Sequence, residues 1–216
     1  MALYFSSSYF TLRFSQCYNH DVQTRSLFYH HSHNYLVRGR EDWLMFDCDW
    51  PGTLPALFRA LKQADVRSDE LRYLLISHYH IDHAGAAEEL KQLGVKLIVL
   101  ETQQAWLNGW IAVAQKDPDQ HFTPISETGN LLLSIDESRG FLTSLGIRGQ
   151  ILSTPGHSED SISLLLEDGS AFIGDLPPVQ WAEGFDSPPL RASWELLVGA
   201  GAKTGYPAHG IPFEVK

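Results

Sequence analysis

The sequence predicts an α/β fold in which two β-sheets pack face to face with helices on their outer sides. Two observations favour it. Both halves of the chain contain several short apolar segments of strand length, and segments with helical periodicity lie between them. The chain has 216 residues, a length that α/β folds often reach as one domain, and a chain of this size buries about 70% of its unfolded surface. We therefore expect a single domain over residues 1–216.

In the first half, strands come first and then alternate with helices. The polar turn Arg38–Asp42 joins the second and third strands and predicts a hairpin. Leu54, Leu57 and Leu61 recur at helical spacing, and Gly94 ends a later helix. The expected strands are Tyr9–Cys17, Ser26–Val37, Trp43–Phe46, Leu71–Ser77 and Val95–Leu100, and the expected helices are Thr53–Ala64, Asp82–Leu93 and Thr102–Lys116.

The second half repeats this style. The turn Glu167–Ser170 predicts a second hairpin between the strands on either side of it. The expected strands are Leu131–Ile135, Gln150–Ser153, Ser161–Leu166, Ala171–Ile173 and Lys203–Tyr206, and the expected helices are Glu137–Leu145 and Leu190–Val198.

Composition excludes several classes of protein. Hydrophobic residues make up 44% of the chain and charged residues 19%, which is typical of a globular domain and excludes a disordered chain or a coiled coil. Lys and Arg number 16 against 26 Asp and Glu, so the formal net charge is −10. This charge disfavours nucleic acids and anionic membranes as partners. We expect a small-molecule substrate; the oligomeric state stays open, with a homodimer as one possibility.

Cysteine content and the N-terminal residues bear on the cellular compartment. The first residues lack a basic segment followed by an apolar one, and no apolar run approaches the roughly 18 residues of a membrane span. Cys17 and Cys48 are too few for a disulfide framework. We expect a cytoplasmic protein.

The strand Leu71–Ser77 runs directly into a cluster of potential metal ligands. His78 and His80 are two residues apart and share one side of an extended backbone, and Asp82 and His83 follow at the turn into the next helix. Imidazoles combined with a carboxylate suit Zn, Fe or Mn better than Ca or Mg. A single histidine is usually an ordinary surface residue, but four such side chains within six residues at a strand end favour a metal site.

Three distant residues share this placement. His157, Asp175 and His209 each follow a predicted strand closely, in a loop that contains Gly or Pro. Because strand ends meet at one edge of an α/β fold, we expect these side chains to join the first cluster.

The segments HYHIDH, TPGH, FIGD and YPAHG occur in that order, and together they resemble the signature of the metallo-β-lactamase superfamily. The resemblance implies a four-layer αββα sandwich of two mixed β-sheets, with a dinuclear metal site at one edge. It implies that His78, His80 and His157 hold one ion, that Asp82, His83 and His209 hold the other, and that Asp175 bridges the two. Asp47 would orient a ligand imidazole, or else cap a turn.

Such a site supports hydrolysis. Two divalent ions about 3.5–4 Å apart hold a bridging water and lower its pKa to about 7, so that a hydroxide forms and attacks a carbonyl. We expect Zn²⁺, with Fe or Mn as alternatives, and a substrate that is a small ester, lactone or thioester. Asp82 is the expected catalytic residue, because it can orient the hydroxide or take its proton.

An Asp at the bridging position resembles the glyoxalase II, lactonase and phosphodiesterase branches more than the true β-lactamases. Three alternatives remain open: a mononuclear iron enzyme like the persulfide dioxygenases, a phosphodiesterase acting on a small phosphate ester, and a scaffold protein without activity.

Two further sets of residues are ambiguous. Aromatic side chains in two segments could cover the site or belong to the core; they are Trp106, Trp110, Phe122, Trp181 and Phe185. The cluster His30, His31 and His33 is interpreted as ordinary strand residues, or as the source of one contact to a ligand.

Overall fold

Two β-sheets form the centre of this computed structural model, which describes residues 23–109, 122–179 and 187–215. The first sheet has the order β1-β2-β3-β4-β5-β6 and the second the order β11-β10-β9-β8-β7. Each contains parallel and antiparallel neighbours, so both are mixed. The first sheet consists of β1 (Thr24–Phe28), β2 (His33–Arg38), β3 (Trp43–Phe46), β4 (Leu71–Leu75), β5 (Lys96–Leu100) and β6 (Leu131–Leu133). The second consists of β7 (Gly149–Ser153), β8 (Ile162–Leu166), β9 (Ser170–Gly174), β10 (Thr204–Pro207) and β11 (Phe213–Glu214).

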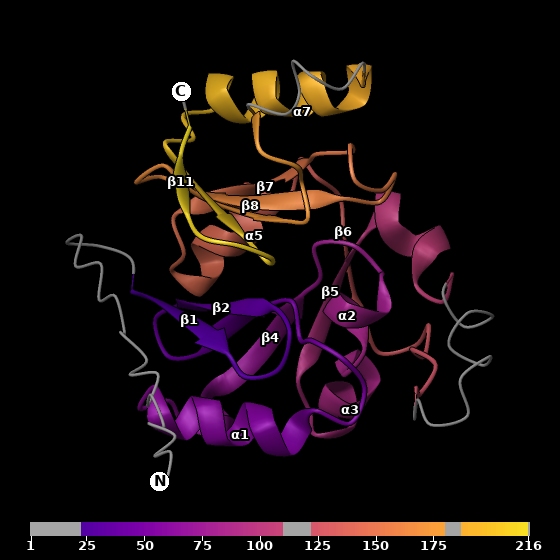
Figure 1. Cartoon of the computed structure of the whole chain (residues 1–216). Helices are drawn as coiled ribbons and strands as arrows, with labels where there is room; N and C mark the ends of the chain where they lie inside the picture. Colours follow the sequence, from indigo (N-terminus) through magenta and orange to yellow (C-terminus); the bar gives the residue numbers. More distant parts are fainter. Residues whose placement is uncertain (1–22, 110–121, 180–186, 216) are drawn as a thin grey trace, which may run out of the picture.

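Helices cover the outer face of each sheet (Figure 1). In Figure 1, α1 and α3 lie below the first sheet and α7 lies above the second. The helices are α1 (Leu54–Gln63), α2 (Ile81–Ala84), α3 (Ala87–Gln92), α5 (Ser138–Leu145) and α7 (Pro188–Gly199), with 3-10 turns η1 (Ser68–Glu70) and η2 (Glu101–Trp106).

Alternation along the strands builds the layers. Trp43 and Met45 of β3 pack in the cluster that includes α1 and α3, whereas Leu44 and Phe46 pack against the second sheet. On the far side, Trp194 of α7 packs in a third cluster with residues of the second sheet. Each fully buried Leu or Phe contributes about 1.5–3 kcal/mol. The predicted four-layer sandwich is confirmed.

Three expected elements differ in the structure. The strand Ser26–Val37 is two strands, because the chain turns at residues 29–32, where backbone N–H groups bond to Asp49 instead of to a strand. The helix Asp82–Leu93 divides at Gly85, which packs so closely on Pro51 that a Cβ there would lie 2.4 Å from its ring. The helix Thr102–Lys116 is a 3-10 turn as far as Trp106.

Two expected elements lie wholly or partly outside the described residues, and one observed strand was not predicted. The strand Tyr9–Cys17 and the end of the helix Thr102–Lys116 lie outside the described residues. The short strand β11 was not predicted.

Strand directions bring several loops to one edge of the sandwich. β3 and β4 are parallel, as are β9 and β10, and β7 runs in the same direction as β9 because both are antiparallel to β8. The turn between β1 and β2 lies at the carboxyl end of β3, since β2 is antiparallel to β3. We call this the loop edge.

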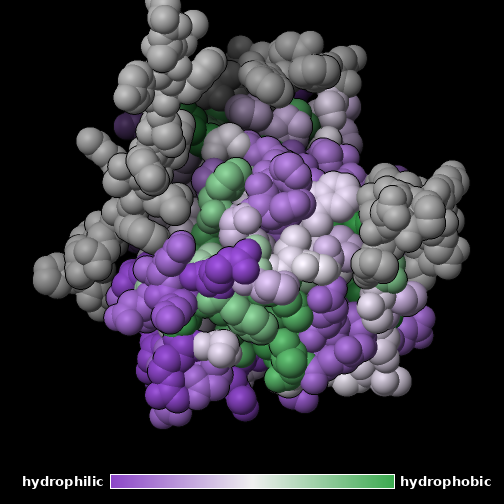
Figure 2. Space-filling view, turned by 60° about the horizontal axis from the view of Figure 1, so that its bottom comes forward, coloured by the Kyte–Doolittle hydropathy of each residue, from purple (hydrophilic) through white to green (hydrophobic). Residues whose placement is uncertain are grey.

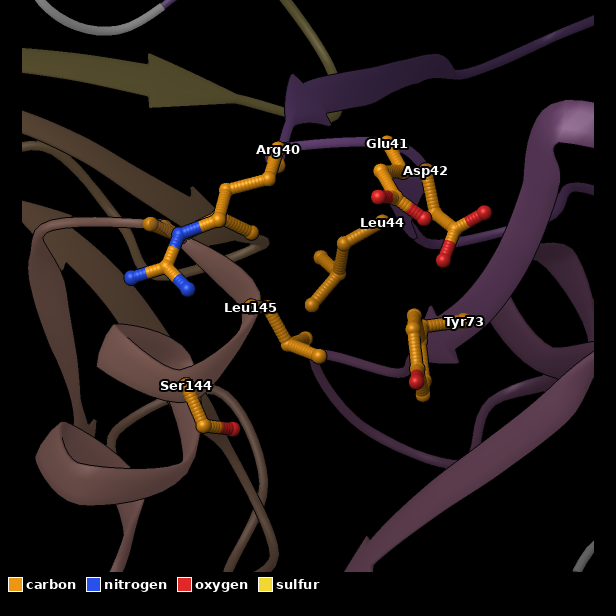
Figure 3. Close-up of a pocket in the computed structure, with 9 residues that line it drawn as sticks. Arg40, Glu41, Asp42, Leu44, Tyr73, Ser144 and Leu145 are labelled. Carbon is orange, nitrogen blue, oxygen red and sulfur yellow. The ribbon is translucent and has the colours of Figure 1, made fainter.

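The opposite edge carries a cavity of about 300 Å³ between the β2–β3 turn and α5. Figure 3 shows Leu44 and Leu145 at its centre, with Arg40 on one side and Tyr73 on the other. No histidine lines this cavity, so it is distinct from the predicted metal site.

The outer face on the side of α1 is mostly hydrophilic. In Figure 2 a hydrophobic group occupies the middle of this face, with hydrophilic residues around it. Within the described ranges, none of the helices combines the length and apolar character needed to cross a membrane. The cytoplasmic location stays a prediction.

Candidate metal centre

Three imidazoles from two loops form a first group at the loop edge. His78 and His80 follow β4, and His157 lies in the loop after β7. Their ligand atoms all lie within 4.8 Å of one another, and His157 Nε2 is 3.1 Å from His80 Nδ1. His78 is fully buried and His157 is exposed, so the group reaches from the core to solvent.

Two carboxylates and two imidazoles form a second group beside it. Asp82 and His83 belong to α2, Asp175 follows β9 and His209 follows β10, and their ligand atoms also lie within 4.8 Å of one another. His209 Nε2 is 3.2 Å from Asp82 Oδ2.

Asp175 is the residue that reaches both groups. Its Oδ2 lies 3.4 Å from His83 Nε2 in the second group and 3.6 Å from His157 Nε2 in the first. The structure therefore brings all seven predicted residues together, in the two groups that the resemblance implied.

Protonation differs between the groups. Burial and the neighbouring imidazoles, His83 foremost, hold the pKa of His78 well below its ordinary value. Burial and His157 lower the pKa of His80 as well. Both rings are neutral near pH 7, the form in which imidazole binds a metal.

In the second group the pKa values are set mainly by charge pairs between carboxylates and imidazoles. Burial lowers the pKa of His83, but the charges of Asp47 and Asp175 outweigh it and raise the pKa to about 10. Burial raises the pKa of Asp82, but His209 and His83 outweigh it and lower the pKa to about 2. The ionised carboxylates of this group are stabilised by positive charge nearby, which either protons on the imidazoles or a metal cation can supply.

Several buried atoms lack hydrogen-bond partners and suit a cation. They are His78 Nε2, His83 Nε2 and Asp175 Oδ1, one from the first group and two from the second. Leaving such atoms unpaired costs about 1–3 kcal/mol each, so their convergence indicates a ligand. Imidazole nitrogens and carboxylate oxygens are the donors that zinc prefers.

Asp47 supports both groups from behind. Its carboxylate accepts hydrogen bonds from the backbone N–H of Ser77 at 2.7 Å and the Ser77 hydroxyl at 2.8 Å, and its Oδ2 lies 2.9 Å from His83 Nδ1. Ser77 Oγ also lies 3.0 Å from His78 Nδ1. Asp47 therefore contacts a candidate ligand imidazole, and Ser77, which the sequence interpretation missed, links it to a second.

Two further buried residues brace the histidine segment. Asp160 accepts the backbone N–H of Tyr79, between His78 and His80, at 2.7 Å. The side-chain amide of Gln103 donates to the carbonyls of Ile76 and Asp160, both at 3.0 Å. Sequence reasoning missed both; a polar residue three positions after His157 was the only signal for Asp160.

Gly174 lets the two sheets approach each other at the site. Its φ is +54°, and a Cβ there would lie 2.5 Å from the side chain of Ser77. Only glycine fits, because both the backbone conformation and the space exclude a side chain. This close approach places Asp175, the next residue, beside the histidine segment.

The ambiguous residues have mixed outcomes. Trp106 is 38% exposed rather than part of the core, and Phe122 is half-buried. Trp110, Trp181 and Phe185 lie outside the described residues. The interpretation of His30 and His31 as strand residues is wrong, since both lie in the turn between β1 and β2, whereas His33 begins β2.

Comparisons with curated proteins agree with this geometry. The chain is 29% identical over 176 residues to the uncharacterized protein YobT of Bacillus subtilis, covering 74% of this chain and 71% of that protein. It is 29% identical over 150 residues to the lactamase-like protein nscB of Trichophyton rubrum, covering 67% of this chain and only 38% of that protein.

Solved structures share the fold. A metallo-beta-lactamase family protein from Thermus thermophilus superposes with a TM-score of 0.65 at 20% identity, over 85% of this chain and 70% of that chain. A putative metallo-beta-lactamase from Thermotoga maritima superposes with a TM-score of 0.69 at 17% identity, over 90% of this chain and 100% of that chain.

The family model of the metallo-beta-lactamase superfamily matches residues 29–176, more than half of the chain. The match includes His78, His80, Asp82, His83, His157 and Asp175 and ends just after β9, so that α7, β10 and His209 lie beyond it. The fold, the donor groups and the family model agree, and the chain belongs to the metallo-beta-lactamase superfamily.

Proposed function

We propose that this chain is a hydrolase that holds two divalent ions, zinc by preference, and cleaves a small ester, lactone or thioester. The family and the two donor groups support a metal-dependent hydrolase in general. The position of Asp175, within 3.6 Å of an imidazole in each group, carries the proposal of two ions, since a carboxylate placed in this way can be shared by a pair of ions.

In this proposal His78, His80 and His157 hold one ion, while Asp82, His83 and His209 hold the other. Asp175 binds both. A pair of divalent ions supplies a water of lowered pKa and an electrophile for the carbonyl oxygen of the substrate.

Asp82 is the proposed catalytic residue of the chain. Its low pKa keeps it ionised at neutral pH, and its side chain is 25% exposed, so that Oδ2 can accept a hydrogen bond from the attacking water. His209 Nε2 lies 3.2 Å from this oxygen, and both would face the same ion. The proton that Oδ2 accepts can pass to the leaving alcohol or thiol.

Charge narrows the substrate class. The net charge of −10 disfavours polyanions such as nucleic acids. A small neutral ester, lactone or thioester does not meet this long-range repulsion.

Elemental analysis combined with a substrate panel tests the proposal. Purified protein is assayed for metal and then for hydrolysis of p-nitrophenyl acetate, S-phenyl thioacetate, δ-valerolactone and bis(p-nitrophenyl) phosphate. Two zinc ions per chain with turnover of a carbonyl substrate would support it. One iron per chain with oxygen uptake on a persulfide would favour the oxidoreductase alternative, and cleavage of the phosphate diester alone would favour the phosphodiesterase.

A further inference from the structure

The turn between β1 and β2, residues 29–32, lies against the second group of candidate ligands. The Ser32 hydroxyl donates to the backbone carbonyl of Asp82 at 3.4 Å, and the next residue, His33, donates its N–H to the carbonyl of Ala208 at 2.8 Å. Ala208 precedes His209 directly. The turn is therefore bonded on one side to the segment of Asp82 and on the other to the segment of His209.

A buried carboxylate anchors this turn. Asp49 is fully buried, and its Oδ2 accepts the backbone N–H groups of His31 and Ser32, each at 3.3 Å. Its Oδ1 lies 3.2 Å from His30 Nδ1 and accepts the N–H of Trp50 at 2.8 Å. The carboxylate thus holds three consecutive residues of the turn.

This anchor is unusual for a turn with two exposed residues. Asp49 adopts a φ of +61°, which costs energy for a residue other than glycine, and burying a carboxylate costs more. The other hairpin turn of the same sheet does without one, since Gly39 N simply donates to the carbonyl of Asp42 at 2.8 Å. Strain and buried charge of this kind concentrate at functional sites.

The turn also exposes two imidazoles. His30 and His31 are exposed, and their ring centroids are 4.0 Å apart. Imidazole nitrogens donate hydrogen bonds to oxygen atoms, which suits groups beside a scissile carbonyl.

We propose that the turn 29–32 forms one wall of the substrate site beside Asp82 and His209, and that Asp49 is the positioning residue that fixes this wall. The inference rests on the proposed function. It assigns to this turn a role in contacting the substrate rather than the metal.

Hydrogen exchange of the intact chain tests the anchor without requiring turnover. In the wild type we expect saturating Zn²⁺ to slow amide exchange in residues 29–33 at least about fivefold, because the turn is bonded to both ligand segments. Asp49→Gly keeps a residue that tolerates the positive φ but removes the carboxylate. In this variant we expect fast exchange with or without Zn²⁺, at an unchanged zinc content. Asp49→Asn, which retains the size of the side chain, serves as a second variant with a smaller change.

Asp65→Gly is the matched control. Asp65 also adopts a positive φ, of +55°, but it is exposed at the end of α1 and its carboxylate holds no turn at the loop edge. We expect the exchange of residues 29–33 in this variant to match the wild type. Zinc-dependent protection that persists in Asp49→Gly, or loss of zinc from that variant, would overturn the proposal.

Steady-state kinetics of the Asp49→Gly variant distinguish a substrate-contacting turn from one that only supports the fold. With p-nitrophenyl acetate we expect Asp49→Gly to raise KM about tenfold and to change kcat by less than about threefold. A fall in kcat alone would contradict a substrate wall. If the wild type hydrolyses no substrate of the panel, the proposed function fails, while the exchange measurements still decide whether Asp49 couples the turn to the zinc site.

Discussion

The two groups of candidate ligands lie side by side but differ in charge and proton content. The first contains three imidazoles, and burial together with neighbouring rings lowers the pKa of His78 and His80. The second contains two carboxylates, and these raise the pKa of His83 and His209. His78 and His80 are ready to bind a cation without losing a proton, whereas His83 and His209 must exchange protons for the cation.

The difference arises from what surrounds each group. Asp47 and Asp175 face His83 from two sides, at 2.9 Å and 3.4 Å. The Nδ1 of His78 instead faces the neutral hydroxyl of Ser77, which stands between the ring and Asp47. The Ser77 hydroxyl therefore separates the neutral His78 ring from Asp47, the carboxylate that raises the pKa of His83.

Removing the shared carboxylate should have the largest effect, because it acts on both groups. We expect Asp175→Ala to lose at least one ion and to reduce kcat/KM by roughly 10³-fold or more, about 4 kcal/mol of transition-state stabilisation. Elemental analysis and turnover of the best panel substrate measure both effects. Asp136→Asn, which removes an exposed carboxylate in another loop, is the control. Full hydrolysis by metal-free Asp175→Ala would refute the proposed chemistry.

Removing one imidazole from each group should separate them. We expect His80→Ala and His209→Ala each to retain one ion instead of two, and to lower kcat/KM by about 10²-fold or more, as the loss of a group that stabilises developing charge does. The pH dependence of zinc binding should differ between the two variants. We expect zinc binding to release protons in His80→Ala, where the second group is intact, but not in His209→Ala. Isothermal titration with Zn²⁺ in two buffers of different ionisation enthalpy measures the protons released. Equal proton release in both variants would remove the distinction between the groups.

Much of this arrangement follows from local sequence. All seven candidate ligands stand within a few residues of a predicted strand end, where backbone direction alone brings them to one edge. Their roles as ligands remain predictions, but their meeting at this edge is observed.

The supporting contacts could not be read from local sequence. Asp160 and Tyr79 are 81 residues apart, and Asp49 and His31 are 18 apart, so each contact depends on how the loops pack. The same packing explains the wrong strand Ser26–Val37. Asp49 accepts hydrogen bonds from the N–H groups of His31 and Ser32, which a continuous strand would have given to its neighbour.

Metal-free protein should show the charge difference as a pH dependence of stability. The raised pKa of His83 gives stability that is complete below its ordinary value of 6.5 and is lost as the pH rises through about 10. The lowered pKa of Asp82 gives stability that is complete above 3.8 and is lost as the pH falls through about 2. The lowered pKa values of His78 and His80 act in the opposite sense and remove stability as the pH falls below 6.5. We therefore expect Tm of chelator-treated protein to be highest near about pH 6.5 and to fall on either side, by about 2–4 °C per kcal/mol lost.

Zinc should reverse the slope above pH 6.5, since binding requires deprotonated imidazoles and becomes stronger as protons leave. Thermal unfolding of chelator-treated and zinc-loaded samples across about pH 4–10 measures both slopes. Parallel curves for the two samples would show that the second group does not exchange protons for metal.

The smallest expected effect concerns Ser77, the link between the groups. Ser77→Ala removes the hydroxyl between Asp47 and His78 Nδ1 but keeps the backbone N–H that bonds to Asp47. Loss of such a supporting contact typically lowers metal affinity by about 10–100-fold. For Ser77→Ala we expect zinc affinity to fall about tenfold in the first group, because the His78 ring stays packed, and less than threefold in the second. Stepwise zinc titration measures both affinities, with Ser138→Ala, a buried serine of α5, as the control. In the double variant Ser77→Ala with Asp47→Asn, we expect the loss of zinc affinity to be smaller than the sum of the two single losses, because both residues belong to one hydrogen-bonded chain. Additive losses, or a larger loss of affinity in the second group, would mean that Asp47 supports the two groups independently.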